Sequence, residues 1–192
     1  MFKIFYTLLM IACAALFSIS ASAQEKKAAE APKPADSPYK EMLWDWNDIG
    51  RKLIDMAEDF PEAKYDFKAQ KDERTFAENL IHVVADEYNI ISAIKGITVG
   101  PTGDEKALHE QYPTKAEIVN LMKQVVADGA QVIEEQGDSG LTREFLYPYA
   151  NIMIHGSAGW LGTIEHAGEH YGQLVVYYRL NDMIPPESRP KK

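Results

Sequence analysis

The chain is poor in cysteine and has no excess of positive charge. Its 192 residues include one cysteine, Cys13, and 20 basic against 29 acidic side chains, which gives a formal net charge of −9. A disulfide scaffold and a thiolate zinc site both need several cysteines. Nucleic acid is bound mainly through clustered lysine and arginine, and a glycine-rich phosphate loop is also absent. Disulfide scaffolds, CxxC redox pairs and nucleic acid as the main partner are therefore excluded.

Residues 1–23 have the pattern of a secretory signal peptide. Lys3 supplies the positive start, residues 4–17 form a mainly apolar run, and Ala21-Ser22-Ala23 matches the small-x-small cleavage pattern. The run is shorter than the about 20 apolar residues that a membrane-spanning helix needs. We therefore expect export across the inner membrane to the periplasm, with Gln24 as the mature N-terminus and no stable membrane insertion afterwards.

Two other interpretations of this segment are an uncleaved N-terminal anchor and a lipoprotein that is cut before Cys13. Met10-Ile11-Ala12 is a poor lipobox, and the residues that follow Cys13 are apolar, so the cleaved signal peptide is favoured. Cleavage leaves 169 residues with 19 basic and 29 acidic groups and no cysteine. A core must then stabilise the fold, and a chain of this length buries roughly 70% of its unfolded surface.

A polar segment separates the predicted signal from the folded domain. Residues 24–38 are rich in alanine, lysine, glutamate and proline and lack apolar periodicity, which predicts a disordered linker. The domain is expected over residues 39–188, followed by a tail over 189–192. Within the domain, apolar residues recur at intervals of three and four, which is typical of helices with one buried face. These predicted helices cover about residues 42–60, 74–95, 114–136 and 160–180.

Local signals mark the ends of these helices. Pro61 ends the first helix and Gly96 the second, and residues 114–117 (Thr-Lys-Ala-Glu) form a capping box that begins the third. Residues 96–113 form a long connection. Residues 141–159 are loop-rich, with alternating aromatic residues over a stretch too short to define a sheet. The sequence therefore predicts an all-α protein, an antiparallel four-helix bundle with a loop-rich insertion before the last helix.

The fourth predicted helix carries a histidine pair, His166 and His170. Residues four apart share one face of a helix, so both imidazoles can bind one metal ion. The alternative is two surface histidines at this spacing by chance, because HxxxH is suggestive but not rare. The same segment spells the H-x-x-E-H of inverzincin proteases, with Glu169 as general base. Only 22 residues follow it, too few for the distant acidic ligand of those proteases, so we do not favour a protease.

The other histidines give weaker signals. His82 falls among polar residues on the second predicted helix, away from the apolar stripe, so periodicity alone predicts a surface histidine. His109 and His155 lie in predicted connections and are expected to be loop histidines, with His155 close enough to the fourth helix to be a pocket candidate. Glu87 projects toward the apolar side of its helix, either as a carboxylate near the site or as a side chain that reaches outward.

Two segments resemble the DinB/YfiT-like four-helix-bundle proteins. They are residues 74–83 (RTFAENLIHV) and residues 166–179 (HAGEHYGQLVVYYR), and the resemblance covers about residues 39–188. Members of this family bind a divalent metal with one histidine of the second helix and an HxxxH pair of the fourth. Matched residue by residue, the resemblance implies His82, His166 and His170 as metal ligands. It therefore disagrees with helical periodicity on His82.

The resemblance implies a metal-dependent enzyme, a hydrolase or transferase that acts on a small molecule. Zinc or nickel suits three imidazole ligands best, and iron or manganese is also compatible. Candidate catalytic groups are Glu87, Glu169 and Tyr177. Family members include thiol-cofactor-dependent transferases and a maleylpyruvate isomerase type, and an export signal is a departure from the cytoplasmic thiol-dependent members. The alternatives are a non-catalytic metal- or ligand-binding module of the cell envelope and a purely structural domain, and a homodimer also stays open.

Overall fold

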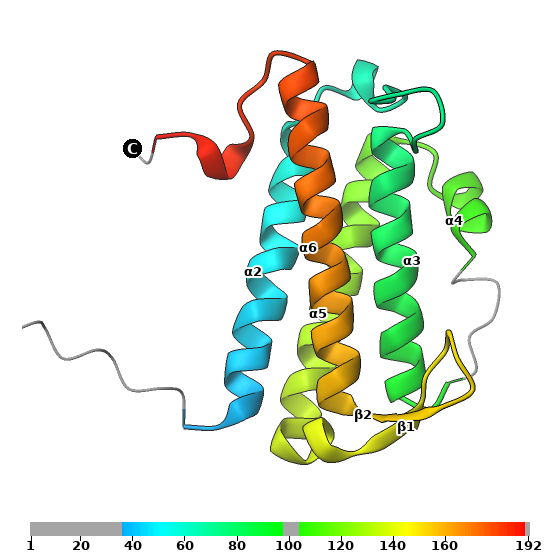
Figure 1. Ribbon diagram of the computed structural model, residues 1–192, viewed down its shortest axis with the longest axis vertical. Helices are drawn as coiled ribbons and strands as arrows, with labels where there is room; N and C mark the ends of the chain where they lie inside the picture. Colours follow the sequence, from blue (N-terminus) through cyan, green and yellow to red (C-terminus); the bar gives the residue numbers. More distant parts are fainter. Residues whose placement is uncertain (1–35, 98–103, 191–192) are drawn as a thin grey trace, which may run out of the picture. The chain divides into compact units, whose positions relative to one another are not determined.

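The computed structural model describes residues 36–97 and 104–190. The predicted signal peptide, nearly all of the predicted linker and part of the connection after the second helix lie outside the described residues. Four long helices pack together as a bundle (Figure 1), which confirms the predicted fold class. They are α2 (Pro38–Asp59), α3 (Phe76–Ile94), α5 (Lys115–Thr142) and α6 (Gly156–Leu180).

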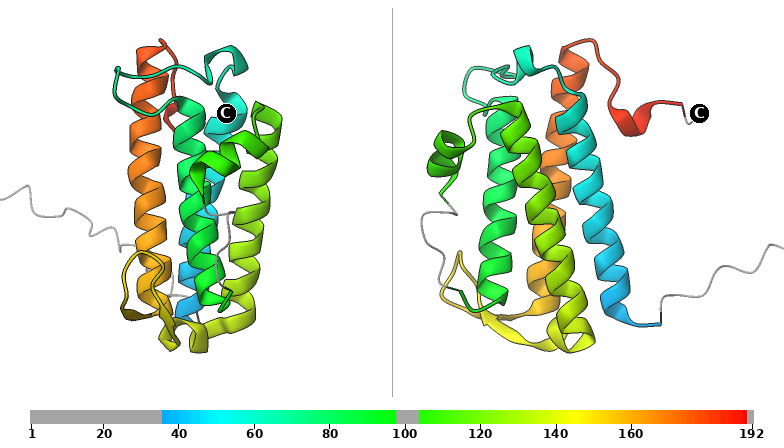
Figure 2. Two further views of the ribbon diagram at one scale, coloured as in Figure 1. Left: turned by 90° about the vertical axis from the view of Figure 1, so that its right-hand side faces the viewer. Right: turned by 180° about the vertical axis from the view of Figure 1, so that it is seen from behind.

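The four helices do not simply alternate in direction. Helices α2 and α6 run one way and α3 and α5 run the other, as the views from the side and from behind show (Figure 2). The chain returns by way of a short helix, α4 (Glu105–Gln111), to the end of the bundle at which α3 begins, and only then enters α5. As a result, α3 packs antiparallel against α6, and α2 packs antiparallel against α5.

Side-chain caps fix where the helices begin. The predicted capping box at α5 is confirmed, because the Thr114 side chain accepts from the amide of Glu117 and the Glu117 carboxylate accepts from the amide of Thr114. Thr75 and Glu78 form the same arrangement at the start of α3. Gly96, directly after the C-cap of α3, has φ +71°, which is the left-handed conformation expected of a helix-ending glycine.

Three details differ from the sequence prediction. The connection over residues 96–113 contains α4, whose N-cap Asp104 accepts from two backbone amides; a helix of 7 residues is too short for periodicity to show. Helix α5 breaks at Gly137, where φ is 55° and ψ is −152°, but helical turns resume and reach Thr142. Helix α6 begins at Gly156 rather than near Trp160.

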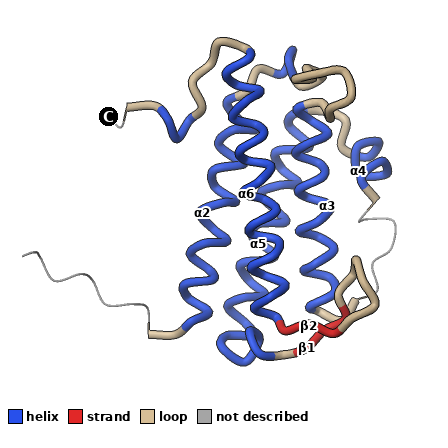
Figure 3. The backbone as a smooth tube through the Cα atoms, viewed as in Figure 1, coloured by secondary structure: helices blue, strands red, loops and turns tan. Residues whose placement is uncertain are grey.

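The loop-rich insertion before α6 contains a β-hairpin. Strands β1 (Glu144–Leu146) and β2 (Met153–His155) pair antiparallel, with Phe145 opposite Ile154 (Figure 3). This hairpin is the only sheet in the described part of the chain. Gly159 lets it pack closely, because a Cβ atom at this position would lie 2.6 Å from Cζ of Phe145.

The core runs the length of the bundle and is rich in aromatic rings. Trp46 and Trp160 meet edge to face with 5.4 Å between ring centroids, and the Trp46 indole donates to the backbone oxygen of Val126 at 2.8 Å. Nearer the other end, Phe60 stacks on Phe76 at 3.9 Å. Most residues of the four predicted apolar stripes are buried. None of the described helices is long and apolar enough to span a membrane.

A substitution at Leu174 on α6 tests whether this residue belongs to the core. Its side chain is fully buried, so Leu174→Ala removes apolar contacts and leaves a cavity, which should lower the free energy of unfolding by about 2–5 kcal/mol. Val176→Ala on the same helix is the control, because Val176 is 47% exposed. Urea denaturation of the three proteins measures both changes, and equal unfolding free energies would exclude Leu174 from the core.

Candidate metal centre

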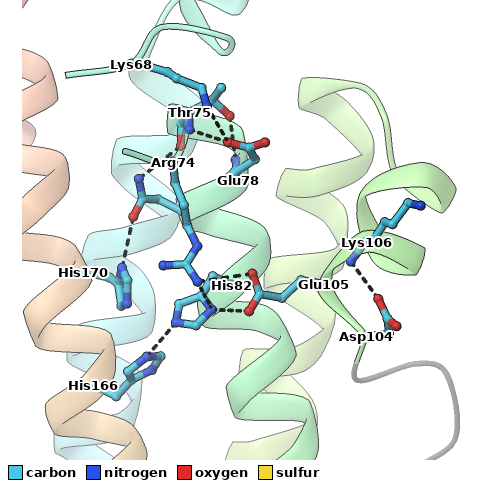
Figure 4. A network of polar contacts seen from close by, with 11 residues as sticks. Lys68, Arg74, Thr75, Glu78, His82, Asp104, Glu105, Lys106, His166 and His170 are labelled. Atoms are coloured by element: carbon cyan, nitrogen blue, oxygen red, sulfur yellow. Dashed lines mark hydrogen bonds and ion pairs between the residues drawn. The ribbon is translucent and has the colours of Figure 1, made fainter. Parts of the chain in front are cut away.

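Three histidines converge between α3 and α6. His82 of α3 and His166 and His170 of α6 each offer a ring nitrogen, and these atoms all lie within 4.8 Å of one another (Figure 4). The ring centroids are 4.7 to 4.9 Å apart in all three pairs. His170 is buried, whereas 22% of the His82 side chain and 26% of the His166 side chain are exposed. The triad is therefore largely dry and still reachable from outside.

His82 reaches this triad because α3 presents two different faces to its neighbours. Its apolar stripe packs into the core, and a polar face with Asn79, His82 and Asp86 lies against α6. Helical periodicity treats a polar face as solvent-exposed and so misplaced His82. The residue match to the DinB/YfiT-like proteins placed it with the other two histidines, as the structure does.

Asn79 determines which nitrogen of His170 is protonated. The Asn79 amide nitrogen donates to the backbone oxygen of Thr75 at 3.1 Å, and its oxygen lies 3.1 Å from Nδ1 of His170. Because the Thr75 oxygen only accepts, the amide cannot be flipped, and the Asn79 oxygen must accept from His170. Nδ1 of His170 therefore carries the proton, which leaves Nε2 with a free lone pair.

Tyr177 holds Asn79 in this orientation. Its hydroxyl donates to the backbone oxygen of Arg74 and accepts from the Asn79 amide nitrogen at 3.2 Å. The Tyr177 ring is buried and its pKa is raised, chiefly by burial. Tyr177, a catalytic candidate from the sequence, therefore contacts the triad only through Asn79 and acts as a positioning residue for His170.

Glu105 of α4 orients His82 in the same way. Its Oε1 atom lies 2.6 Å from Nδ1 of His82, and a carboxylate can only accept, so Nδ1 donates. The Arg74 guanidinium lies 3.5 Å from the other Glu105 oxygen and 3.2 Å from Nδ1 of His82. Glu105 therefore turns Nε2 of His82 toward α6, where it lies 3.0 Å from Nε2 of His166.

Asp86 is the partner of His166. One Asp86 oxygen lies 3.4 Å from Nδ1 of His166 and accepts from the Thr163 hydroxyl at 2.7 Å. At 3.4 Å the two atoms are too far apart for a close hydrogen bond, and the contact becomes an ion pair only when His166 is protonated. Asp86 raises the pKa of His166, and burial only partly opposes this. Burial raises the pKa of Asp86, but His166, Tyr149 and Thr163 together outweigh it, so the pKa of this carboxyl is lowered.

The His170 ring of the triad is uncharged. Burial and the two neighbouring imidazoles lower the pKa of His170 to about 4, so this ring is neutral at neutral pH. With Nδ1 of His82 donating to Glu105 and Nδ1 of His166 facing Asp86, two Nε2 atoms meet at 3.0 Å. A nitrogen–nitrogen distance of 3.0 Å requires either an N–H hydrogen of one imidazole or a metal ion between the two atoms.

A cleft of about 570 Å³ opens beside the triad, between α3, α6 and the hairpin. His82, His166 and Asp86 line one end of it, and tyrosine and isoleucine side chains of the hairpin line the other. A volume of this size suits a small molecule. The cleft gives the triad a solvent-accessible approach that is polar at one end and apolar at the other.

The two candidate catalytic glutamates lie elsewhere. Glu87 is 2% exposed, so it neither reaches outward nor lines the cleft, and burial together with Asp86 raises its pKa to about 8. Glu169 is exposed on α6 and does not line the cleft. His155 is the N-cap residue of α6 without a side-chain capping hydrogen bond, and its Nδ1 lies 3.0 Å from the backbone oxygen of Thr142 in α5. His109 lies in α4, and neither histidine belongs to the triad.

Sequence reasoning missed the residues that orient the triad. Asn79 and Asp86 lie three residues before and four after His82, so a polar face at helical spacing was visible, although nothing marked it as buried against another helix. Glu105 gave no signal, because it lies in a connection and meets His82 only through the fold.

The fold and this triad define a class of protein: an all-α four-helix bundle with a candidate metal centre between two antiparallel helices. A family model, the DinB superfamily, matches residues 47–174, which is more than half of the chain and includes all three histidines. The chain belongs to the DinB superfamily. Among curated proteins, none matches this chain.

Solved structures show the same fold. A DinB-like protein from Bacillus cereus superposes with a TM-score of 0.64 at 17% identity, over 77% of this chain and 95% of the other. YfiT from Bacillus subtilis superposes with a TM-score of 0.63 at 15% identity, over 80% of this chain and 94% of that one. YfiT is described as a probable metal-dependent hydrolase with an unusual four-helix bundle topology.

Glu87 makes the stability of the protein depend on pH. Its pKa is about 8 in the folded state and 4.5 as a free side chain, so between these values the folded state holds a proton that the unfolded state lacks. The contribution of Glu87 to the free energy of unfolding is therefore largest below pH 4.5. It declines as pH rises to about 8, by up to about 1.4 kcal/mol per pH unit. Glu87→Gln, which stays neutral, should remove this slope.

Urea denaturation at several pH values from 5 to 8 measures the slope. Glu169→Gln is the matched control, because this exposed glutamate should leave the wild-type slope unchanged. Identical slopes for wild type and Glu87→Gln would show that Glu87 is ionised in the folded protein.

Proposed function

We propose that His82, His166 and His170 bind one divalent metal ion and that the protein is a metal-dependent hydrolase or transferase acting on a small molecule. The observation that carries the proposal is the convergence of three imidazoles within 4.8 Å, each with its Nδ1 atom facing an oxygen of another residue. The description of the structural neighbour YfiT as a probable metal-dependent hydrolase supports the same proposal.

The donor set fits such an ion. A tetrahedral zinc site with Zn–N bonds of about 2.0–2.1 Å places its nitrogen atoms about 3.3 Å apart, and two Nε2 atoms already lie 3.0 Å apart. Three imidazoles without cysteine suit zinc or nickel, and iron or manganese is also compatible. Three protein ligands leave positions for substrate, as in catalytic rather than structural sites.

A divalent ion at this triad supplies a Lewis acid that polarises a carbonyl group or lowers the pKa of water. The chain supplies the rest. Asn79, Glu105 and Asp86 keep the imidazoles oriented, and the buried position of His170 keeps its ring neutral and free of a competing proton. The cleft admits a small molecule to the side of the triad formed by His82 and His166.

A non-catalytic binding module is the second candidate, and one observation favours it. The two carboxylates that line the cleft are already engaged, Asp86 with His166 and Thr163, and Glu105 with His82 and Arg74. A hydrolase needs a general base within reach of the attacking water. Hydrolysis or group transfer by metal-loaded protein in an activity screen selects the enzyme; metal binding without turnover selects the binding module.

Export to the periplasm forms part of this proposal and rests on the N-terminal sequence pattern alone. Signal peptidase cleavage after Ala23 should give a mature protein that begins at Gln24. N-terminal sequencing of protein from the envelope fraction of the native cells measures this, and a cytoplasmic chain that begins at Met1 would contradict it.

Single alanine substitutions test the metal site. His82→Ala, His166→Ala and His170→Ala should each lower zinc and nickel affinity at least tenfold, because each removes one of three coordinate bonds. Titration calorimetry of metal-free protein with each ion gives the affinities. The decisive variant is His82→Ala, since the helical periodicity that placed His82 on the surface predicts no change.

His155→Ala is the matched control. His155 ends β2 and directly precedes α6, 11 residues before His166 and so about 16 Å from it along the helix axis, and its loss should leave metal affinity unchanged. Wild-type protein that binds none of zinc, nickel, iron and manganese at neutral pH would refute the proposal.

A further inference from the structure

The cleft beside the triad is wide because one glycine of α6 leaves space in it. Gly162 lines the cleft, and a Cβ atom built on it meets no atom within 4 Å. Gly159, one turn earlier, also lines the cleft but is already in contact with Phe145 of the hairpin. Gly162 is therefore the position of α6 at which a side chain would fill the cleft without displacing the packed core.

The hairpin side of the cleft is apolar and aromatic. Tyr147 and Tyr149 meet edge to face with 5.4 Å between ring centroids, and both line the cleft together with Ile152. Tyr149 is 51% exposed and Ile152 is 54% exposed. Aromatic and branched side chains left exposed around a cleft are typical of a small-molecule site.

One polar group of the cleft lining is an acceptor without a partner. The side-chain oxygen of Asn89 is buried and has no hydrogen-bond partner among the described residues, while its nitrogen donates to the Tyr149 hydroxyl at 3.2 Å. A buried acceptor without a partner is unfavourable, so a ligand N–H or O–H group that reaches this oxygen on binding would be favoured. In the described part of the chain, no lysine or arginine lines the cleft to bind a phosphate or a second carboxylate.

We propose that this cleft is the substrate subsite and that it takes a compact molecule with one aromatic or branched-alkyl body and an N–H or O–H donor. The body lies over Gly162 against the tyrosine pair, its donor meets Asn89, and its reactive end points to His82 and His166. Only the orientation of the reactive end rests on the proposed function; binding of the body does not depend on it.

Binding of 4-fluorobenzyl alcohol to full-length protein supplied with zinc, followed by fluorine NMR, tests this subsite. Gly162→Leu should weaken binding at least tenfold, because the leucine side chain occupies the space of the ring. Gly168→Leu is the matched control: its Cβ also meets nothing within 4 Å, but Gly168 lies on α6 outside the cleft. It should bind the probe within twofold of wild type.

Two further comparisons do not change α6, so they test the subsite independently of any effect that the glycine substitutions have on this helix. Tyr149→Ala removes one ring of the tyrosine pair that lines the cleft and should also weaken binding at least tenfold. The methyl ether of the same probe lacks the O–H donor and should bind at least threefold more weakly than the alcohol to wild type. The alcohol and the ether should bind to Asn89→Ala with equal affinity, because this variant lacks the acceptor. Equal affinity of alcohol and ether for wild type would overturn the assignment of a donor-bearing ligand.

The outcomes separate this subsite from the metal proposal. If wild type binds no probe at millimolar concentration, or if Gly162→Leu and Gly168→Leu behave alike, the subsite is wrong whether or not zinc binds. If zinc does not bind but Gly162→Leu still abolishes probe binding, the subsite stands and the metal proposal fails. Zinc content of the same samples, measured by elemental analysis, distinguishes these cases.

Discussion

The constraint on which the site depends is the placement of three imidazoles in a largely dry space with their lone pairs facing inward. An imidazole is held in this orientation when its other nitrogen donates to a fixed acceptor. Here Asn79 and Glu105 accept from His170 and His82, and Asp86 lies 3.4 Å from Nδ1 of His166; the three residues come from two different helices. Most of the polar organisation of the α3–α6 interface follows from that requirement, including the Thr163 and Tyr177 hydroxyls that hold Asp86 and Asn79 in turn.

The direction of the helices makes this interface possible. Since α3 and α5 run the same way, α3 is free to pack antiparallel against α6, and successive turns of the two helices then meet in opposite order. Asn79 meets Tyr177, His82 meets His166, and Asp86 meets Thr163 along this interface. The return of the chain before α5 also places α4 beside α3, which brings Glu105 to His82.

Much of the fold could be predicted from the sequence because helix formation is local. Apolar spacing located the four long helices, and the capping box at Thr114 and the glycine at position 96 located two of their ends. The histidine pair of α6 was also visible, since two residues four apart on one helix need no tertiary information. His82 required either the fold or the family resemblance, because periodicity separates apolar from polar faces but cannot distinguish a polar face in water from one packed on another helix.

The role of Glu105 could not be predicted from sequence spacing. Its contact with His82 joins a short helix in a connection to a long helix 23 residues earlier, and no spacing rule relates the two. The hairpin that lines the cleft is similar, because two strands of 3 residues carry too little pattern to be recognised. The elements of the site that the sequence did not reveal are therefore the shortest ones, where tertiary contacts rather than local propensity determine the conformation.

The 84 residues that separate His82 from His166 have a thermodynamic consequence. Any ion or molecule that bridges α3 and α6 acts as a reversible cross-link between distant parts of the chain, and it is bound only by the folded state. It then raises the free energy of unfolding by an amount that grows with its free concentration, about 2.7 kcal/mol at one hundred times the dissociation constant. The persistence of this bundle in its environment would thus rise and fall with the supply of whatever occupies the triad.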